Sequence, residues 1–390
     1  MLDNDALQQI LDDWSAWSQR PASSVPRALV EHCVITPKVV TVIQGVRRCG
    51  KSTLLRQLMT AQQITESQAV FINFEDPRLI NDLDYPLLDQ LYQMTCARND
   101  SVMTFFLDEI QNVANWQKWL NRQLESSSGH RFVITGSNSQ LLGGELASSL
   151  TGRHLRYELF PFDFAEFQQL VTPGNLEQFI MQGGFPAALD FPEPKSLLQQ
   201  YFLDIVEKDI RERVSAKSSR PLHAVAKMVL DSVGSELSLR RIAGAVQLSP
   251  ETVNHYLQAC EDAYLIFSCP YFAYSEAKRV RNNRKFYVID TGLRRAISTQ
   301  TGADLGKDFE NLVYLVLRRQ TTAISYWKGK GEVDFVVNTE QGVTPIQVTF
   351  GEPKQRHHDA LEEFYQQFPH ANEAIYVTPD SFSELMTKTF

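Results

Sequence analysis

Residues 45–52 read Gly-Val-Arg-Arg-Cys-Gly-Lys-Ser, a full match to the pattern G-x-x-x-x-G-K-[ST] that defines a P-loop. An apolar run at 39–43 precedes this segment and a helical pattern at 53–58 follows it. A strand, a glycine-rich loop and a helix in this order can cradle phosphate. The glycines let backbone amides surround the oxygens, and the helix N-terminus adds partial positive charge. An ordinary surface turn is the alternative, and the flanking strand and helix disfavour it. The sequence therefore predicts ATP binding on an α/β sheet.

Each polar residue of this segment has an expected task. Lys51 should reach the β- and γ-phosphates, and the Ser52 hydroxyl should bind Mg²⁺. The expected ATP-binding residues are those of the loop and the first helical turn: Gly45, Val46, Arg47, Arg48, Cys49, Gly50, Lys51, Ser52 and Thr53.

A second motif, Phe-Phe-Leu-Asp-Glu at 105–109, is an apolar run that ends in two acids. Asp108 should hold Mg²⁺ through its water shell. Glu109 is placed to polarise an attacking water as general base, which favours hydrolysis over transfer to another acceptor. Alone, such an acid pair is usually a solvated loop; after a P-loop, the functional interpretation is favoured.

Two further residues have two open interpretations each. Ser137 follows the apolar run at 131–135, so its hydroxyl either orients the attacking water or belongs to a plain turn. Arg153 either neutralises γ-phosphate charge, in its own chain or in a neighbouring subunit, or forms a surface salt bridge.

Bulk properties limit the function classes. The chain has 390 residues, 43% of them apolar, which suits two or three domains. The net charge of -8 gives no overall attraction for nucleic acid, so any such contact needs a local patch. The five cysteines form no C-x-x-C pair, which argues against zinc sites and disulfides. The acidic start and the absence of a long apolar run predict a cytoplasmic protein that makes no membrane contact.

Residues 45–166 resemble a bacterial and archaeal group of AAA+-like P-loop ATPases. The matching pieces are the P-loop, Leu-Asp-Glu-Ile-Gln at 107–111, Thr-Gly-Ser at 135–137, Gly152-Arg153 and Leu-Phe-Pro-Phe at 159–162. Members usually carry a C-terminal region of unknown function that looks like a winged helix followed by a restriction-nuclease-like fold. Similar landmarks here are Gly-Gly-Phe-Pro at 183–186, Tyr-Val-Ile-Asp-Thr-Gly-Leu at 287–293 and Glu-Val-Asp-Phe at 332–335. The resemblance implies an ATPase but supplies no substrate.

The expected fold class is therefore α/β, with a P-loop NTPase parallel sheet, then a helical and winged-helix domain, then a nuclease-like α/β domain. The expected ranges are a helical N-terminal extension at 1–36, the ATPase domain at 37–172, the winged-helix domain at 173–300 and the nuclease-like domain at 301–390.

The nuclease-like outline is incomplete. Restriction-nuclease sites use an acid on a helix, an Asp on a strand, and acid-x-Lys on the next strand, so that carboxylates hold magnesium and the Lys assists the water. Glu310 and Asp334 fill the first two places, but Gln347 and Thr349 stand where the acid and the Lys are expected. We expect the fold without cleavage, with Lys330 and Lys354 as the nearby lysines that could substitute.

A basic run is the candidate nucleic-acid contact. It comprises Lys278, Arg279, Arg281, Arg284 and Lys285. It either tracks a nucleic-acid backbone or is a solvated hairpin that offsets acidic neighbours. The helix-turn-helix pattern at 237–260 is a weaker candidate, because acids such as Glu251 on its second helix would repel phosphates.

Three functions remain open at this point. ATP hydrolysis drives a machine that acts on DNA or another nucleic acid, or on a partner protein; or the P-loop is a slow switch with a C-terminal docking module; or the C-terminal domain is an active DNA nuclease. Assembly into a homo-oligomer is compatible with all three.

Overall fold

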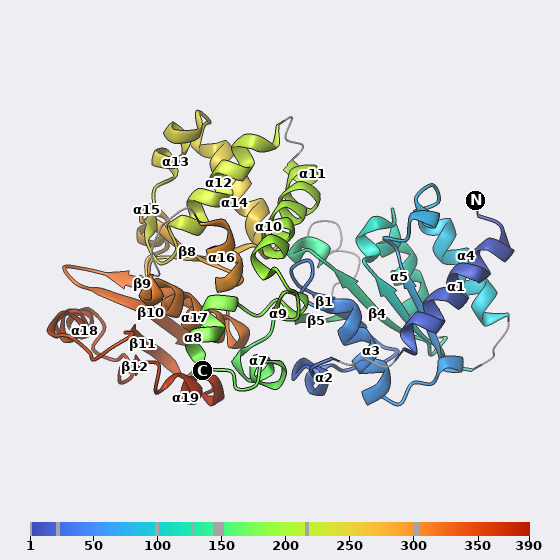
Figure 1. The fold of residues 1–390 in the computed structure, drawn as a ribbon, viewed down its shortest axis with the longest axis horizontal. Coiled ribbons are helices and arrows are strands. Elements are labelled where there is room, and N and C mark those ends of the chain that lie inside the picture. Colours follow the sequence, from blue (N-terminus) through green and yellow to red (C-terminus); the bar gives the residue numbers. More distant parts are fainter. Residues whose placement is uncertain are drawn as a thin grey trace. The chain divides into compact units, whose positions relative to one another are not determined.

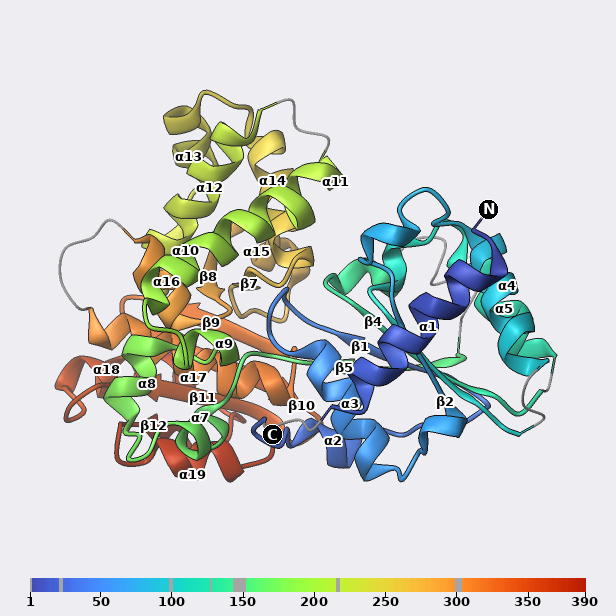
Figure 2. The same cartoon turned by 45° about the vertical axis from the view of Figure 1, so that its right-hand side comes forward.

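The computed structural model describes residues 2–20, 24–97, 101–126, 128–142, 152–214, 218–298 and 304–390 (Figures 1 and 2). The chain forms two compact units, Met1–Leu159 and Phe160–Phe390. The backbone explains the division at this point, since Leu159 N donates to Gln44 O of the first unit and Phe162 N donates to Gly184 O of the second. The expected division into four domains stays a prediction.

The first unit is built on a five-stranded sheet in the order β2-β3-β4-β1-β5, in which all neighbouring strands are parallel. The strands are β1 (Val40–Gln44), β2 (Ala69–Asn73), β3 (Thr104–Asp108), β4 (Arg131–Gly136) and β5 (His154–Glu158). The four apolar runs read from the sequence are β1 to β4, so the predicted parallel P-loop sheet is confirmed. The sequence did not reveal β5, because its residues are mostly polar and only partly buried.

Two helices of this unit begin at a side-chain cap. Asp84 accepts a hydrogen bond from Tyr85 N at the start of α4, and Asp3 accepts one from Ala6 N at the start of α1. The helices are α1 (Asn4–Ser18), α2 (Leu29–His32), α3 (Lys51–Ala61), α4 (Tyr85–Cys96) and α5 (Trp116–Glu125). Short 3₁₀ turns connect them at Glu66–Gln68, Pro77–Leu79, Ile110–Asn112 and Ser139–Leu142.

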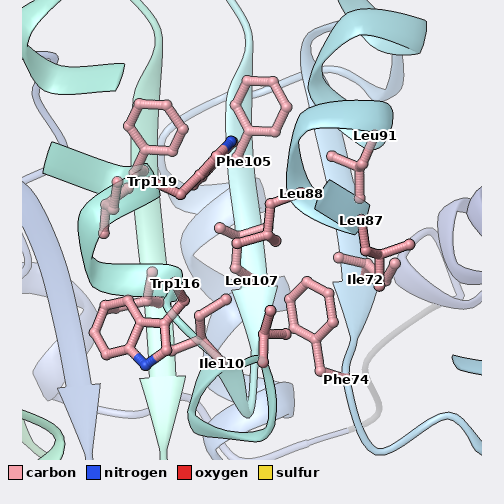
Figure 3. Close-up of a cluster of buried hydrophobic side chains, with 14 of the residues drawn as sticks. Ile72, Phe74, Leu87, Leu88, Leu91, Phe105, Leu107, Ile110, Trp116 and Trp119 are labelled. Atoms are coloured by element: carbon pink, nitrogen blue, oxygen red, sulfur yellow. The ribbon is translucent and has the colours of Figure 1, made fainter. Parts of the chain in front are cut away.

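Side-chain alternation divides the core between the two faces of this sheet. Phe105 and Leu107 of β3 point to the face that α4 and α5 cover, where they pack with Trp119 (Figure 3). Phe71 points to the other face, where its ring lies 6.1 Å from Trp14 of α1 between centroids. Because both faces are buried, the strands are held rigidly and so are the residues at their carboxyl ends.

The second unit begins with helices and a small antiparallel sheet in the order β6-β8-β7. Its strands are β6 (Glu236–Leu237), β7 (Ile266–Cys269) and β8 (Arg284–Val288). Ser249 caps α14 by accepting from Thr252 N at 3.1 Å, which confirms the helix start read from Ser249-Pro250. The helices are α7 (Phe164–Leu170), α8 (Leu176–Gln182), α9 (Pro186–Leu189), α10 (Pro194–Asp204), a π-helical segment (Ile205–Arg211), α11 (Glu212–Val214), α12 (Ser219–Asp231), α13 (Leu239–Val246), α14 (Pro250–Asp262), α15 (Glu276–Arg281) and α16 (Thr291–Ile297).

The C-terminal part of this unit is an α/β layer around a sheet in the order β12-β11-β10-β9. Its elements are α17 (Leu305–Gln320), β9 (Ile324–Lys328), β10 (Glu332–Thr339), β11 (Gly342–Val348), α18 (Gln355–Gln367), β12 (Ile375–Val377) and α19 (Phe382–Thr387). The sequence pattern of helix, three strands, helix and strand is confirmed, with α19 added. In the described part of the chain, no helix is long and apolar enough to cross a membrane.

Within the second unit, Asp290 and Gly292 form a clamp that joins the segments 183–186 and 287–293, two of the segments that resemble the family. The buried Asp290 carboxylate accepts from Gly184 N at 2.6 Å and from Leu293 N at 2.7 Å, which caps α16. A Cβ on Gly292 would lie 2.1 Å from the carbonyl oxygen of Gln182. The glycine therefore permits the close approach of α16 to the end of α8.

We predict that Gly292→Ala destabilises the second unit by about 1–3 kcal/mol, because the methyl group must displace backbone. Gly244→Ala is the matched control, since Gly244 also lies in a helix and a Cβ there meets nothing within 4 Å. It should be neutral or stabilising by up to about 1 kcal/mol. Urea unfolding followed by circular dichroism measures both, and equal midpoints for the two variants would contradict the clamp.

Candidate active site

The P-loop leaves the carboxyl end of β1 and enters α3 at Lys51. Val46 and Cys49 are fully buried, so the loop is curled tightly against the sheet. Gly50 has φ 101° and precedes the first residue of α3, a conformation that suits glycine. Gly45 serves packing, since a Cβ there would lie 2.1 Å from the Leu159 carbonyl oxygen.

Lys51 lies at the centre of the site and is almost completely buried. Its Nζ donates to Gly45 O at 3.2 Å and to Val46 O at 3.4 Å, and it lies 3.1 Å from Glu109 Oε1. Burial opposes the charged ammonium, but Glu109, Cys49 and Asp108 together outweigh it and raise the pKa of Lys51. The lysine is therefore a fixed cation at the mouth of the loop.

Asp108, at the end of β3, is held by donors from three elements. Ser52 Oγ donates to Asp108 Oδ2 at 2.6 Å, and Asn73 Nδ2 donates to the same oxygen at 2.8 Å. Thr135 Oγ1 donates to Oδ1. Burial and the neighbouring Glu109 charge raise the pKa of Asp108 to about 6, against these hydrogen bonds and Lys51.

The Ser52 hydroxyl and the Asp108 carboxylate fit a magnesium ion. Both are hard oxygen donors, and their contact at 2.6 Å brings the two expected ligands to one point. Asp108 is fully buried, so its charge has little contact with water, and a divalent cation beside Ser52 would neutralise it.

Glu109 adopts the left-handed conformation, with φ 54°, which is uncommon for a residue with a side chain. Its backbone N donates to Thr135 Oγ1 at 2.9 Å. Its side chain is clamped at both oxygens, with Lys51 at Oε1 and Gln111 Nε2 at 2.6 Å from Oε2. Burial would raise the pKa of Glu109, but Lys51, the Gln111 hydrogen bond and Arg47 together lower it. The carboxylate is thus kept ionised, as a base requires.

Among the other predicted site residues, Arg47 of the loop pairs with Glu75 at 2.6 Å between Nη1 and Oε1. Thr53 lies in the first turn of α3. Ser137 is buried directly after β4, and its role toward water stays a prediction.

Arg153 does not belong to the phosphate site of its own chain. Its carbonyl accepts from Val40 N, at the start of β1, whereas the P-loop follows the end of that strand. Its guanidinium contacts Asn121 and Glu125 of α5, the second at 3.3 Å. Of the interpretations left open for Arg153, the surface salt bridge is the one present in the structure, because parallel pairing puts residue 153 at the opposite end of the sheet from the P-loop. A role in a neighbouring subunit stays a prediction.

The sequence did not single out four further residues that hold the site: Arg27, Asn73, Gln111 and Thr135. Arg27 is buried, and its Nη1 donates to the Cys49 carbonyl at 3.0 Å. No local signal marks Arg27, because it comes from the segment before β1. Gln111 and Thr135 were visible only as members of the family-like pieces at 107–111 and 135–137.

In the second unit, Lys285 lies among the acids of the nuclease-like region. It is 1% exposed, and its Nζ lies 2.5 Å from Glu332 Oε1 and 3.6 Å from Glu310 Oε1. Burial opposes its charge, but Glu310, Glu332 and Asp334 raise its pKa. The prediction of Lys285 as a nucleic-acid contact was therefore wrong, because this ammonium is committed to buried carboxylates. Lys330 and Lys354 are both exposed, and their substitution for the missing nuclease lysine stays a prediction.

A nuclease-type metal does not fit this cluster. The β10–β11 register sets Asp334 opposite Gln347, whose neutral amide stands in the place of an acid. Burial and the charge of Glu310 raise the pKa of Asp334. Within the described ranges, no three His, Cys, Asp or Glu residues are arranged to hold a metal ion.

Arg279, Arg281 and Arg284 of the basic run border a surface groove of about 930 Å³. Arginines from three elements line it: Arg240 of α13, Arg279 and Arg281 of α15, and Arg284 of β8. Arg279 pairs with Glu276 at 3.1 Å, and Arg284 donates to Asn254 Oδ1 at 2.8 Å. Arg240 and Arg281 are exposed. Lys278 is exposed on the same helix.

Comparisons with known proteins cover nearly the whole chain. Residues 37–168 match a family described as an AAA domain, and residues 174–304 and 305–386 match two domains of unknown function, DUF8612 and DUF4143. An uncharacterized protein of Methanocaldococcus jannaschii is 33% identical over 331 residues, which cover 78% of this chain and 73% of that one. The solved structure of Cdc6p from Pyrobaculum aerophilum is 16% identical, with a TM-score of 0.28 over 69% of this chain and 88% of that one, a likeness too distant to inform function.

An uncharacterized protein of Haemophilus influenzae is 31% identical over 337 residues, which cover 82% of this chain and 84% of that protein. Since this similarity covers most of the chain, the chain belongs to the same family, that of the AAA+-like P-loop ATPases with C-terminal domains of unknown function.

Proposed function

We propose that the chain hydrolyses ATP with Mg²⁺ at the P-loop. The observation that carries the proposal is the pairing of Ser52 Oγ with Asp108 Oδ2 at 2.6 Å beside the pairing of Lys51 Nζ with Glu109 Oε1 at 3.1 Å. A metal-binding pair and a phosphate–base pair thus lie side by side, at the carboxyl ends of β1 and β3, which flank β4.

The residues divide the work as follows. The loop amides and the start of α3 bind the phosphates, and Lys51 neutralises charge on the β- and γ-phosphates. Ser52 and Asp108 would hold Mg²⁺, which supplies positive charge to the phosphate oxygens. Glu109 accepts a proton from water as the water oxygen bonds to the γ-phosphorus and the bond to ADP breaks. Because the general base Glu109 lies next to Lys51, which binds phosphate, water is favoured as the nucleophile over a second substrate.

We predict that Lys51→Ala weakens ATP binding by at least about tenfold, because it removes a buried cation from the phosphate site. Glu109→Gln should keep ATP binding and lower turnover on the order of 10²–10⁴-fold, because it removes only the base. Calorimetry measures binding, and phosphate release measures turnover.

Glu125→Gln is the matched control, because Glu125 is an exposed acid of α5 at the other end of the sheet. It should retain both binding and turnover. Wild-type turnover in Glu109→Gln would remove Glu109 from the mechanism.

We further propose that the groove of the second unit binds a nucleic-acid backbone. With a net charge of -8, only a local cluster can release counterions, and the groove collects four arginines against the two acids Glu251 and Glu276. The start of α14 also borders the groove, so its backbone amides add partial positive charge. If nucleic acid bound in the groove stimulates ATP hydrolysis, the protein is a nucleic-acid-dependent machine. If hydrolysis does not respond to nucleic acid, the slow switch with a C-terminal docking module is favoured.

We predict that the double variant Arg240→Glu with Arg281→Glu abolishes DNA binding at moderate salt. Removing one arginine that binds phosphate should also flatten the dependence of log affinity on log salt by about one unit. Fluorescence anisotropy with labelled single-stranded and duplex DNA measures this. The charge-matched control is Lys195→Glu with Arg220→Glu, because both residues are exposed and lie outside the groove. Equal reductions of affinity in the two double variants would indicate net charge rather than the groove.

We infer that the C-terminal acid cluster does not cleave DNA. Lys285 neutralises Glu310 and Glu332, and the amide of Gln347 lowers the attraction for a hard cation. We expect supercoiled, linear, branched and single-stranded DNA to remain intact in Mg²⁺ or Mn²⁺ on agarose gels. Cleavage that disappears in Asp334→Ala and survives in Lys51→Ala would show that the cluster is an active nuclease.

A further inference from the structure

The carboxylate of Glu109 is held at both oxygens by donors of different kinds. Lys51 Nζ lies 3.1 Å from Oε1, and Gln111 Nε2 donates to Oε2 at 2.6 Å. Gln111 lies two residues further along the chain, in the 3₁₀ turn Ile110–Asn112 that follows β3. One oxygen is thus paired with a charged group and the other with a neutral amide.

The two donors differ in their relation to phosphate. Lys51 belongs to the P-loop, where its ammonium is the group that phosphate oxygens attract. Each bond that Lys51 gives to phosphate competes with its contact to Glu109. The Gln111 amide carries no charge and belongs to the turn after β3, so its hydrogen bond can persist when phosphate engages the lysine. Oε1 is then the oxygen that becomes available, and Oε2 stays bound.

The surroundings fix the orientation of the Gln111 amide. A Cβ on Gly136 would lie 2.7 Å from Gln111 Oε1, so the glycine makes room for the amide oxygen. That oxygen is buried and makes no hydrogen bond among the described residues, while the amide nitrogen binds Glu109. The reverse orientation would set the amide oxygen against a carboxylate oxygen. The contact with Glu109 therefore decides how the amide lies.

The backbone of Glu109 is also fixed, which leaves the side-chain torsions as its remaining freedom. Its N donates to Thr135 Oγ1 at 2.9 Å, and its carbonyl accepts from Asn112 N at 3.2 Å. A glutamate has three side-chain torsions, so a second anchor at the carboxylate is needed to aim one oxygen at a water molecule.

We propose that Gln111 is a positioning residue that holds Oε2 of Glu109 and leaves Oε1 as the atom that takes the proton, an inference that rests on the proposed ATP hydrolysis. In that step one O–H bond of water breaks and its proton moves to Oε1. The water oxygen bonds to the γ-phosphorus, and the bond from that phosphorus to the bridging oxygen breaks with its electrons on ADP.

The test compares Gln111→Met with wild type. Methionine has a similar length but no hydrogen-bond donor, so the carboxylate of Glu109 is no longer held in a fixed orientation. The kcat should therefore fall on the order of 10²-fold. The ATP affinity from calorimetry and the KM should stay within about twofold, because Gln111 does not bind phosphate. Gln111→His restores an N–H donor and should recover part of kcat. Gln123→Met, at another buried glutamine of the same unit, is the control for the substitution itself and should leave kcat unchanged.

The outcomes separate this inference from the proposed function. Wild-type turnover together with an unchanged kcat in Gln111→Met would overturn the inference and leave ATP hydrolysis standing. A parallel loss of kcat and ATP affinity, or an equal loss in Gln123→Met, would overturn it in favour of a structural role. A wild-type chain that binds ATP without hydrolysing it would overturn both.

Discussion

The ion pair between Lys51 and Glu109 is the interaction on which the site depends. Both groups are buried at the carboxyl edge of an apolar parallel sheet, and Asp108 lies beside them. Burying charges in such a place is costly unless each is paired and hydrogen-bonded. Burial, and then the charge of Glu109, raise the pKa of Asp108. Phosphate and a divalent cation bring charges of both signs to this point, so the arrangement suits their joint binding.

The polar residues around this pair follow from the same constraint. Asn73 ends β2 and Thr135 lies near the end of β4, and both donate to Asp108 where a core residue would otherwise be apolar. The apolar layer of α4 and α5 beneath them is what allows the sheet edge to carry so many buried polar groups (Figure 3). Residues in the middle of each strand therefore pack in the core and stabilise the fold, whereas residues at the carboxyl end form the candidate active site.

Local patterns predicted the parts of the structure that depend on local chemistry. The P-loop, β1 to β4, and the acids Asp108 and Glu109 were readable because each is a short continuous segment with a characteristic pattern. The position of Arg153 was not readable, since it depends on the pairing of β5 with β1 across more than a hundred residues. Arg27 reaches the P-loop from a segment with no motif, for the same reason.

The basic run shows the same limit within a few residues. Arg284 lines the groove, whereas Lys285, the next residue of β8, is buried among carboxylates from α17 and β10. Alternation along β8 puts neighbouring side chains on opposite faces, and only the tertiary structure decides which face meets water. A row of cations in the sequence thus serves two purposes. One part faces a solvent groove, and the other neutralises an acid cluster that would otherwise attract a metal ion.

The central claim is that the Ser52–Asp108 pair is the metal-binding point of a nucleotide site. The most direct test is Mn²⁺ electron paramagnetic resonance, titrated with and without a non-hydrolysable ATP analogue. We expect nucleotide-dependent Mn²⁺ binding that is lost in Asp108→Asn and retained in Glu310→Gln. Mn²⁺ binding that needs no nucleotide, survives Asp108→Asn and disappears in Glu310→Gln would contradict it, because the metal centre would then lie in the C-terminal acid cluster.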